Sequence, residues 1–408
     1  MGSGPGLYED TRVTDLRAPH PEEMAAAIGD VELAFGGAPH EADTALDLTV
    51  LDPARCLAVF EDGRAVVTAG SFDLAMTVPG AVLPVAGVSW VSVAPTHRRR
   101  GLLTQAMDRQ LSDLHTAGTA VAALWATEGG IYQRFGYGPA AWRASFDLTR
   151  GAAFTRPVST SGLRLTDPTG ALLAPAYDVV AGQTPGWWVR EERWWGYRLH
   201  DPEHRREGFS PLRCVVDGDD GYALYVTKGS WSDAGPDGTV GVREIVARTP
   251  EAWARLWRYL LDQDLMATVN AWGRPTDDPV LHLLADPRGA RLSVALWVRL
   301  VSVPDALAGR RYAAPVDVVL DVTDTRCPWN TGRWRLSGDT SGAACSPTSD
   351  AADLVLDVRE LGAAYLGATP LTARARAGWV GEQTPGALAA ASTAFGWAGP
   401  VASCPMVF

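Results

Sequence analysis

Residues Val91 to Thr104 have the composition of a phosphate-binding turn. A strand-like run leads to Pro95, which lacks the N–H needed to extend a β ladder, and an amphipathic helix is predicted from Gly101 to Ala117. The first N–H groups of a helix have no intrahelical partner and lie at the positive end of its dipole, so the junction suits a diphosphate. Gly101 permits close approach, and the arginines ending at Arg100 add positive charge. A basic surface turn that caps a helix is the alternative, but the flanking strand and helix favour the phosphate site.

The elements around this turn predict an α+β unit. The Asp62-Gly63 pair is a strong hairpin signal between two of its strands. Helices are predicted at Pro21–Phe35 and 131–134 besides the one after the turn, and strands at 56–60, 65–72, 81–93, 120–125 and 141–148. Backbone groups of Val91 and Val93, at the end of the third strand, can bond the amides of a pantetheine arm.

The rest of the chain is predicted to contain a second, degenerate copy of this unit and a smaller domain. The second copy has strands at 212–216, 222–227, 239–246, 266–270 and 292–300 and a helix at 250–263, with no phosphate turn before that helix. After a boundary at Pro304–Pro315, strands are expected at 316–322, 334–336 and 353–358, and helices at 358–365 and 386–395. The Ser- and Gly-rich stretch Ser337–Asp350 is predicted to be a mobile turn or loop. The predicted domains are 1–150, 151–302 and 303–408.

Composition limits the class of protein. The chain has 408 residues, 47% hydrophobic and 20% charged, as expected of a folded globular protein of two or three domains. A net charge of −11 disfavours nucleic-acid binding and suits a cationic small-molecule partner. Five scattered cysteines indicate neither a metal site nor a disulfide framework. Residues 1–10 lack the order of a signal peptide, and no run reaches the ~18 apolar residues of a membrane span, so a soluble cytoplasmic protein without a membrane role is expected.

Two motifs resemble those of a known family. The pattern V-x-V-x-P-x-x-R-R-R-G-L-L from Val91 to Leu103 is similar to the acetyl-CoA pyrophosphate loop of GNAT acetyltransferases, and Ile131-Tyr132-Gln133-Arg134-Phe135-Gly136-Tyr137 is similar to their Y-x-x-x-G-F segment. Leu103 at a position that is usually small, the E-G-G-I-Y-x-R-F-G-Y-G-P-A run and the C-terminal aromatic residue resemble the enhanced intracellular survival (Eis) branch. The resemblance implies two tandem GNAT-like domains, a sterol-carrier-protein-like C-terminal domain and a homo-hexamer.

The resemblance also implies which residues hold the cosubstrate. Acetyl-CoA would contact the strand end and the turn, and no metal is expected. The implied cofactor contacts are Val91, Ser92, Val93, Arg99, Arg100, Gly101, Leu102, Leu103 and Thr104, together with Thr127 and Glu128 after the next strand. Thr127 stands where this branch often has serine, so a hydroxyl is retained.

Tyr132 is the candidate general acid. Acetyl transfer to an amine leaves a thiolate that must be protonated, and a phenol of pKa ~10 is reasonably matched to a thiol of pKa ~8.5. The resemblance implies this role, because the matching tyrosine of Eis-like enzymes is the proton donor. Without the resemblance, a core aromatic residue with a hydrogen-bonded hydroxyl is the simpler interpretation.

The carboxylate of Phe408, the last residue, is the candidate general base. Eis-like enzymes use their terminal carboxylate in this way, and residues 401–408 carry no charged side chain, although chain ends are usually polar. An apolar tail favours burial, which would raise the pKa of the carboxylate from ~3.5 and make it a better base. The alternative is a tail that only completes the core of the third domain. Eis relatives often carry an acidic residue before the terminal aromatic. Val407 stands there in this chain, a departure that concerns acceptor preference and not acetyl transfer.

Carboxylates and aromatic faces together suit an ammonium-bearing acceptor. The candidates for this pocket are Asp30, Glu32, Phe35, Trp187, Trp188 and Trp195, with core packing and a solvated helix face as the alternative for each residue. The predicted function is acetyl-CoA-dependent N-acetylation of primary amines, with aminoglycosides as the class that the resemblance implies. Protein lysine or polyamine acetylation, and a lipid or acyl-CoA carrier, are the alternatives.

Overall fold

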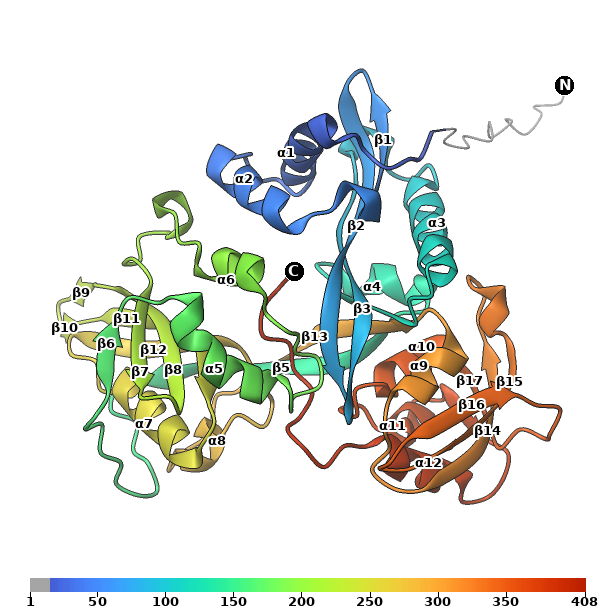
Figure 1. Cartoon of the computed structure of the whole chain (residues 1–408). Helices are drawn as coiled ribbons and strands as arrows, with labels where there is room; N and C mark the ends of the chain where they lie inside the picture. The colour runs from blue at the N-terminus through green and yellow to red at the C-terminus, as the bar shows by residue number, and fades with distance from the viewer. Residues whose placement is uncertain (1–14) are drawn as a thin grey trace, which may run out of the picture. The chain divides into compact units, whose positions relative to one another are not determined.

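The computed structural model describes residues 15–408, so the prediction about a signal peptide at 1–10 lies outside the described residues. The chain forms two compact units, and Figure 1 labels helices and strands of both. The first contains residues up to Asp73 and Ala86–Gly118, and the second contains Leu74–Val85 and Thr119–Phe408. Mixed helices and strands throughout confirm the predicted α+β class.

The first unit contains the predicted phosphate turn. Strand β3 (Ala81–Val93) enters the turn, and helix α3 (Leu102–Thr116) leaves it. Strand β1 (Cys56–Glu61) pairs antiparallel with β2 (Arg64–Val78), and the Asp62-Gly63 hairpin is confirmed, with φ of 50° and 75° at its two turn residues. Leu102 and Ala106 of α3 pack on valines of β1 and β2, which fixes the helix on the sheet. Helices α1 (Met24–Ala34) and α2 (Glu41–Val50) precede the strands, and α2 was not predicted.

One continuous sheet crosses the predicted boundary at residue 150. Its order within the second unit is β4, β13, β5, β12, β11, β8, β7 and β6. Their bounds are Val121–Trp125, Arg291–Leu300, Gly138–Thr149, Met266–Arg274, Gly238–Ala247, Gly221–Lys228, Arg213–Asp217 and Arg164–Thr166. Strand β13 is inserted between β4 and β5 and is antiparallel to both. Residues from the far end of the second predicted domain therefore complete the sheet of the first.

Helices bury both faces of this sheet. Helix α7 (Pro250–Leu261) packs its Trp257 against strand residues such as Val215 and Ile245, while α5 (Gly170–Ala181) packs Tyr177 against their neighbours on the other face. Strands β11 and β12 are parallel and joined by α7, as a crossover requires. The remaining elements here are α4 (Gly129–Tyr132), α6 (Glu192–Leu199), α8 (Val280–Leu283), and the pair β9 (Trp231–Ser232) and β10 (Gly235–Pro236).

The C-terminal part has its own five-stranded sheet, in the order β16, β15, β14, β17, β18. The strands are Ala343–Pro347, Gly332–Gly338, Val316–Thr323, Leu354–Asp357 and Val380–Glu382, and the helices α9 to α12 are Val303–Gly309, Val358–Ala364, Leu371–Arg376 and Ala387–Phe395. The prediction of a mobile loop over Ser337–Asp350 was wrong, because Ala343–Pro347 pairs with β15. Helix α10 lies against the large sheet so closely that a Cβ on Gly362 would overlap the carbonyl of Val298 in β13.

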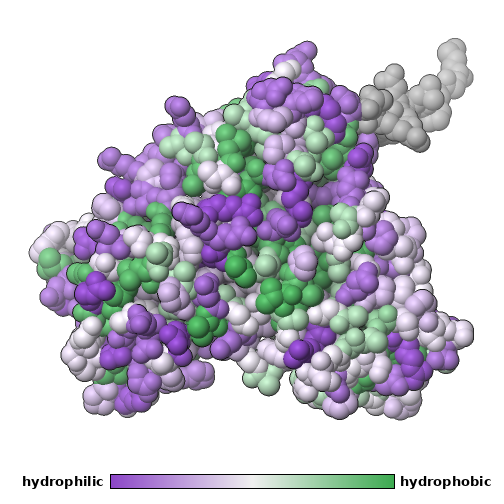
Figure 2. Space-filling model, viewed as in Figure 1, coloured by the Kyte–Doolittle hydropathy of each residue, from purple (hydrophilic) through white to green (hydrophobic). Residues whose placement is uncertain are grey.

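The surface shows no single continuous apolar face in the view of Figure 2, where hydrophilic and hydrophobic residues alternate. Exposed large apolar side chains such as Trp231, Leu292 and Leu165 come from separate elements. Over residues 15–408, no helix combines the length and apolar character needed to cross a membrane.

Candidate active site

The turn between β3 and α3 is held in shape by side chains of its own unit. His97 contacts the Glu61 carboxylate at 2.9 Å, and Arg98 donates from Nε to the carbonyl of Val93 at 3.3 Å and from Nη2 to that of Ala34 at 3.2 Å. Arg98 is therefore occupied with the backbone. Arg99 has no hydrogen-bond or ion-pair partner anywhere in residues 15–408, and its exposed side chain is available to a ligand.

The amino end of α3 is open. Its N-cap is Gly101, with φ of +79°, no capping side chain, and no atom within 4 Å of where a Cβ would lie. The corresponding helix of the second copy, α7, has a capped amino end. The Thr249 hydroxyl accepts a hydrogen bond from the Ala252 N–H, and Pro250 occupies the first turn. Of these two helix ends, only the one at Gly101 leaves N–H groups for an outside anion. The residues present there fit the diphosphate of coenzyme A.

Strand β3 is strained directly before the turn. Trp90 has φ of +57°, which is unusual for a bulky residue, and its carbonyl accepts a 2.7 Å hydrogen bond from the Thr68 hydroxyl. Thr68 also lies 2.9 Å from the Ser92 hydroxyl, so the Ser92 side chain is used within the sheet. Val91 and Val93 are half-buried on the core of β1, β2 and α3. Their predicted backbone contacts to pantetheine stay predictions.

Tyr132 ends the four-residue helix α4 in the second unit, after the exposed strand-end pair Thr127 and Glu128. Its ring is buried and lies edge-on to Tyr137, with centroids 6.0 Å apart. Within residues 15–408 its hydroxyl has no hydrogen-bond partner, so the hydrogen bond of the simpler, core-aromatic interpretation is absent there. Burial, and then the charge of Glu128, raise the pKa of Tyr132 above its usual value. The phenol therefore keeps its proton at neutral pH, as an acid must.

The C-terminal tail is fastened at several points to other parts of the second unit. The Val401 N–H donates to the Asp277 carboxylate at 3.0 Å, and the Ser403 N–H donates to the carbonyl of Pro185 at 3.0 Å. The indole N–H of Trp187 donates to the Ser403 hydroxyl at 2.9 Å. A Cβ on Gly186 would overlap the carbonyl of Ser403, so this backbone contact requires glycine. The path of the tail is thus fixed by backbone contacts up to Ser403.

The last residues extend from these anchors to the tryptophans. The indole N–H of Trp125 lies 2.9 Å from the Cys404 sulfur, and the ring of Phe408 packs edge-on against Trp188, with centroids 5.3 Å apart. The expectation of an apolar tail in buried surroundings is met at Ala402 to Cys404 but not at Val407, whose side chain is 48% exposed. The neighbouring Phe408 is half-buried.

A cavity of about 260 Å³ borders the tail. One wall is the stacked pair Trp125 and Trp272, with centroids 5.6 Å apart, and Arg143 covers the Trp272 face at 4.3 Å. Another wall contains Glu244, whose carboxylate is bound by Arg190 and Arg198. Burial alone would raise the pKa of Glu244, but these arginines outweigh it and lower the pKa to about 2. The carboxylate is charged and already neutralised, so it offers little attraction to an ammonium group.

The predicted acceptor residues have unequal roles. Asp30 is bound by Arg64 at 2.6 Å and by the Ala65 N–H at 2.8 Å, so it holds the start of β2. Phe35 is 57% exposed and Glu32 is partly exposed, and both belong to the first unit. All three predicted tryptophans are buried: Trp187 and Trp188 contact the tail, and Trp195 packs on Tyr177 and Arg190. Core packing, the alternative weighed for these indoles, fits what they contact.

Several residues that shape the site were not predicted. Asp277, Pro185 and Gly186 hold the tail, and Ser403 and Cys404 are its polar contacts. The two tail residues carried a signal, because they are small polar residues in an otherwise apolar segment. Asp277 carried none, since it is one of many aspartates in loops.

Models of known families match three consecutive segments of the chain. Residues 15–140 and 186–300 each match an acetyltransferase (GNAT) domain, and residues 303–404 match a sterol carrier protein domain. With the open helix end after β3, these matches define the class: an N-acetyltransferase with two GNAT domains, whose cosubstrate is acetyl-CoA, followed by a sterol-carrier-like domain. The degenerate second copy is thus a GNAT domain. The predicted limits at residues 150 and 302 stay predictions.

Relatives of similar length narrow the class to one family. An uncharacterized N-acetyltransferase from Streptomyces avermitilis is 43% identical over 397 residues, which cover 94% of this chain and 97% of the relative. N-acetyltransferase Eis from Mycobacterium tuberculosis is 39% identical over 321 residues, 72% of this chain and 74% of Eis. The crystal structure of Eis1 from Mycobacterium abscessus superposes with a TM-score of 0.83 at 33% identity, over 97% of this chain and 100% of that one. The chain belongs to the Eis family of GNAT acetyltransferases, which confirms the resemblance.

Proposed function

We propose that this enzyme transfers an acetyl group from acetyl-CoA to a primary amine of a cationic acceptor, with aminoglycosides as the first candidates. The observation that carries the proposal is the fastening of the tail at Asp277, Pro185 and Trp187, which leaves Phe408 against Trp188. A tail that only completed the core of the third domain would not need contacts to the second domain at each of these residues.

The roles of the residues follow from the chemistry of the transfer. Acetyl-CoA, when bound, supplies the acetyl thioester, and Arg99, Arg100 and the open N–H groups after Gly101 would hold its diphosphate. The amine nitrogen forms the new N–C bond, and the C–S bond breaks. The terminal carboxylate of Phe408 accepts the proton of the amine, and the Tyr132 hydroxyl gives its proton to the thiolate.

The acceptor class is proposed from charge and exposure. The net charge of −11 favours a cationic ligand over an anionic one. Glu32 and the exposed ring of Phe35 have the chemistry that suits an ammonium group. Polyamines and lysine side chains share that chemistry, so both belong in the test beside aminoglycosides.

The test is acceptor-dependent release of free thiol from acetyl-CoA with aminoglycosides, polyamines and a lysine-rich peptide. Tyr132→Phe should lower kcat by roughly 10²- to 10⁴-fold, the usual contribution of a general acid or base. Deleting Phe408 moves the terminal carboxylate back by one residue, about 3.3–3.8 Å, and adding one glycine moves it forward by the same distance. Both changes should lower kcat in the same range if the carboxylate is the base.

The control for the tail variants is an amidated terminus, made by ligating a synthetic tail peptide. It keeps every side chain and removes only the charge, so it should be as slow as the deletion. Full activity of the amidated chain would exclude the carboxylate as base. No acceptor-dependent thiol release with any amine, by a folded protein that binds acetyl-CoA, would contradict the proposed reaction.

A lipid-carrier role is disfavoured by the interior of the third domain. Arg310 is fully buried there and donates to the carbonyls of Tyr365 and Phe395, with the rings of both residues and of Tyr312 around its guanidinium. A buried charge bound to backbone carbonyls makes this interior a poor environment for an apolar ligand.

By family resemblance we also propose that the protein assembles as a homo-hexamer. Light scattering on the purified full chain should then give a mass six times that of the 43.5 kDa chain. A monomeric mass at every protein concentration tested would contradict this proposal.

A further inference from the structure

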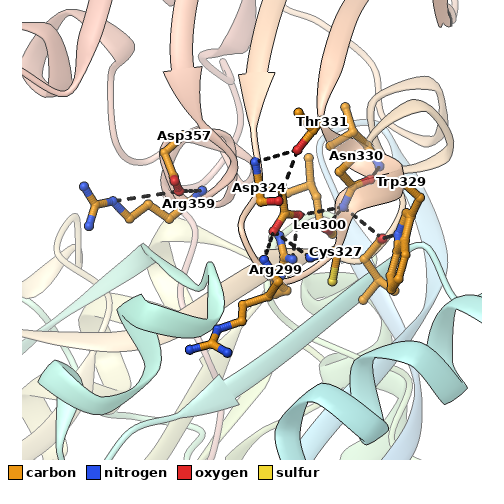
Figure 3. Close-up of polar contacts among 12 residues, drawn as sticks. Arg299, Leu300, Asp324, Cys327, Trp329, Asn330, Thr331, Asp357 and Arg359 are labelled. Carbon is orange, nitrogen blue, oxygen red and sulfur yellow. Dashed lines mark hydrogen bonds and ion pairs between the residues drawn. The ribbon is translucent and has the colours of Figure 1, made fainter. Parts of the chain in front are cut away.

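Arg299 of β13 is a fully buried charge beside the segment that carries Tyr132. A Cβ on Gly136 would lie 2.8 Å from the guanidinium, so the arginine packs directly on the backbone four residues after Tyr132. Of its guanidinium nitrogens, Nη2 donates to the Asp324 carboxylate at 2.6 Å (Figure 3). The other two nitrogens, Nε and Nη1, are buried with no partner among residues 15–408.

Asp324 belongs to the loop after β14 of the sterol-carrier-like domain, and its position is fixed. Its carboxylate accepts hydrogen bonds from the N–H groups of Arg326 and Cys327 at 3.1 and 3.0 Å, and from the Asn330 amide at 3.0 Å. Asn330 is itself held by the Val303 N–H and the Val301 carbonyl. This network makes Asp324 a rigid support for Arg299, and Figure 3 shows the part of it formed by Asp324, Cys327 and Asn330.

The same loop contacts the Tyr132 segment directly. The Arg326 guanidinium lies 5.6 Å from the centre of the Phe135 ring, and its Nε donates to the Arg134 carbonyl at 3.4 Å. The loop thus meets residues 134 and 135, while Arg299 packs on residue 136. The backbone after Tyr132 is therefore held by groups from outside the first GNAT domain.

Helix α4 cannot fix Tyr132 alone. It has four residues, its N-cap makes no side-chain hydrogen bond, and the Tyr132 hydroxyl has no partner in residues 15–408. The ring is located by packing on Tyr137, whose own hydroxyl is buried without a partner in the same residues. The contact of Gly136 with Arg299 therefore adds to the contacts that Arg326 makes with residues 134 and 135 in orienting the segment.

We propose that Arg299, held by Asp324, is a positioning residue for Tyr132, so that the sterol-carrier-like domain contributes to the chemical step. The inference rests on the proposed function, in which Tyr132 is the general acid. A buried ion pair costs desolvation and is often replaceable by apolar residues without loss of stability. Its use here is geometric: Nη2 of the planar guanidinium binds Asp324 while Cζ, Nη1 and Nε pack against the Gly136 turn.

The test compares two lysine variants. Arg299→Lys keeps the charge and loses the fork, and we expect kcat at saturating amine to fall roughly 10- to 100-fold, because a displacement of about 1 Å suffices for such a loss. KM for the amine should not change. The control is Arg310→Lys, the same substitution at another fully buried arginine, one that contacts Tyr365 and Phe395 instead of the Tyr132 segment. It should lower the melting temperature without lowering kcat.

A double-mutant cycle with Tyr132→Phe separates positioning from stability. If Arg299 acts through the Tyr132 hydroxyl, Arg299→Lys has no further effect on kcat once that hydroxyl is gone. An equal loss in both backgrounds, or a loss that Arg310→Lys reproduces, would overturn the proposal. If Arg299→Lys does not fold, Asp324→Asn, which keeps the shape and removes the charge, is tested in the same cycle.

The two proposals fail in different ways. A Tyr132→Phe enzyme with full kcat would show that the proposed acid is wrong, and Arg299 would then have no acid to position. A slow Tyr132→Phe enzyme beside an Arg299→Lys enzyme of normal kcat would leave the acid in place and overturn only the positioning role.

Discussion

At the scale of single residues, the pH dependence of kcat should reflect Tyr132. Because burial, and then Glu128, raise its pKa, the phenol is protonated throughout the neutral range and loses its proton only as pH rises past the usual value of ~10. The acid form is therefore complete below that pH. We expect kcat measured from about pH 7 to pH 10 to show no decline caused by this group. A decline near pH ~8.5 that disappears in Tyr132→Phe would contradict the raised pKa.

Gly101 allows a second residue-scale prediction with a matched control. Gly101 and Gly118 both have positive φ, 79° and 74°, no atom lies within 4 Å of a Cβ at either, and they flank the two ends of α3. Alanine at either position should cost about 1–2 kcal/mol of stability through backbone strain. Only Gly101→Ala, at the open amino end, should also raise KM for acetyl-CoA, by about tenfold. Thermal melts and steady-state kinetics of both variants test this, and an equal KM rise in Gly118→Ala would exclude a local role.

The residues of the phosphate turn could be predicted because they are contiguous in the sequence. Strand, proline, arginines, glycine and helix follow one another between Val91 and Thr104, and local patterns describe such neighbours well. Asp277 and Arg299 could not be found in this way. They reach the tail and the Tyr132 segment only through tertiary pairing, and nothing local distinguishes them from other charged residues. The partner of Asp30 could not be found for the same reason, since Arg64 reaches it only in the fold.

At the scale of elements, the tail is the part whose position should control kcat. Trp187→Phe and Ser403→Ala remove the same 2.9 Å hydrogen bond from its two sides. Each should lower kcat several-fold, because loosening the tail moves the terminal carboxylate, and the double variant should be no slower than the slower single one. Measuring kcat for the two single variants, the double variant and the parent chain gives the coupling free energy between Trp187 and Ser403.

The control for this cycle is Tyr259→Phe. It removes the 2.7 Å hydrogen bond between the hydroxyls of Tyr259 and Tyr225, in the core under α7. It should lower the melting temperature and leave kcat unchanged. Additive losses in the Trp187 and Ser403 double variant would show that the two residues act on kcat independently of their shared bond.

Helices and strands whose hydrophobic residues repeat with a regular period could be predicted from the sequence. Some that contain or adjoin proline, glycine or serine, which favour turns, could not. Helix α5 was missed because Pro175 lies inside it, although Thr169 supplies a side-chain N-cap before it. The serine and glycine residues around strand β16 predict a loop, but its backbone completes the ladder with β15. The place of β13 between β4 and β5 could not be predicted, because the partners of a strand are not encoded in its own residues.

At the scale of the whole molecule, the net charge of −11 should make acceptor binding depend on salt. The Debye length falls from about 10 Å at 0.1 M to about 3 Å at 1 M, so attraction of a distant cation is screened. KM for a cationic amine should therefore rise over that range, whereas KM for a primary amine without further charge should change much less. Equal salt dependence for both amines would show that the net charge does not select the acceptor.

The insertion of β13 between β4 and β5 also sets an order of events during synthesis. Strand β4 is complete at Trp125, but its neighbour in the sheet ends at Leu300. At about 5–20 residues per second, a ribosome needs roughly 10–35 s to make the intervening chain. Until then the edges of β4 and β5 have no strand between them and are open to pairing with other chains. The first GNAT domain therefore cannot finish folding when its own residues emerge, and a nascent chain stalled before Leu300 should be a target for chaperones and proteases.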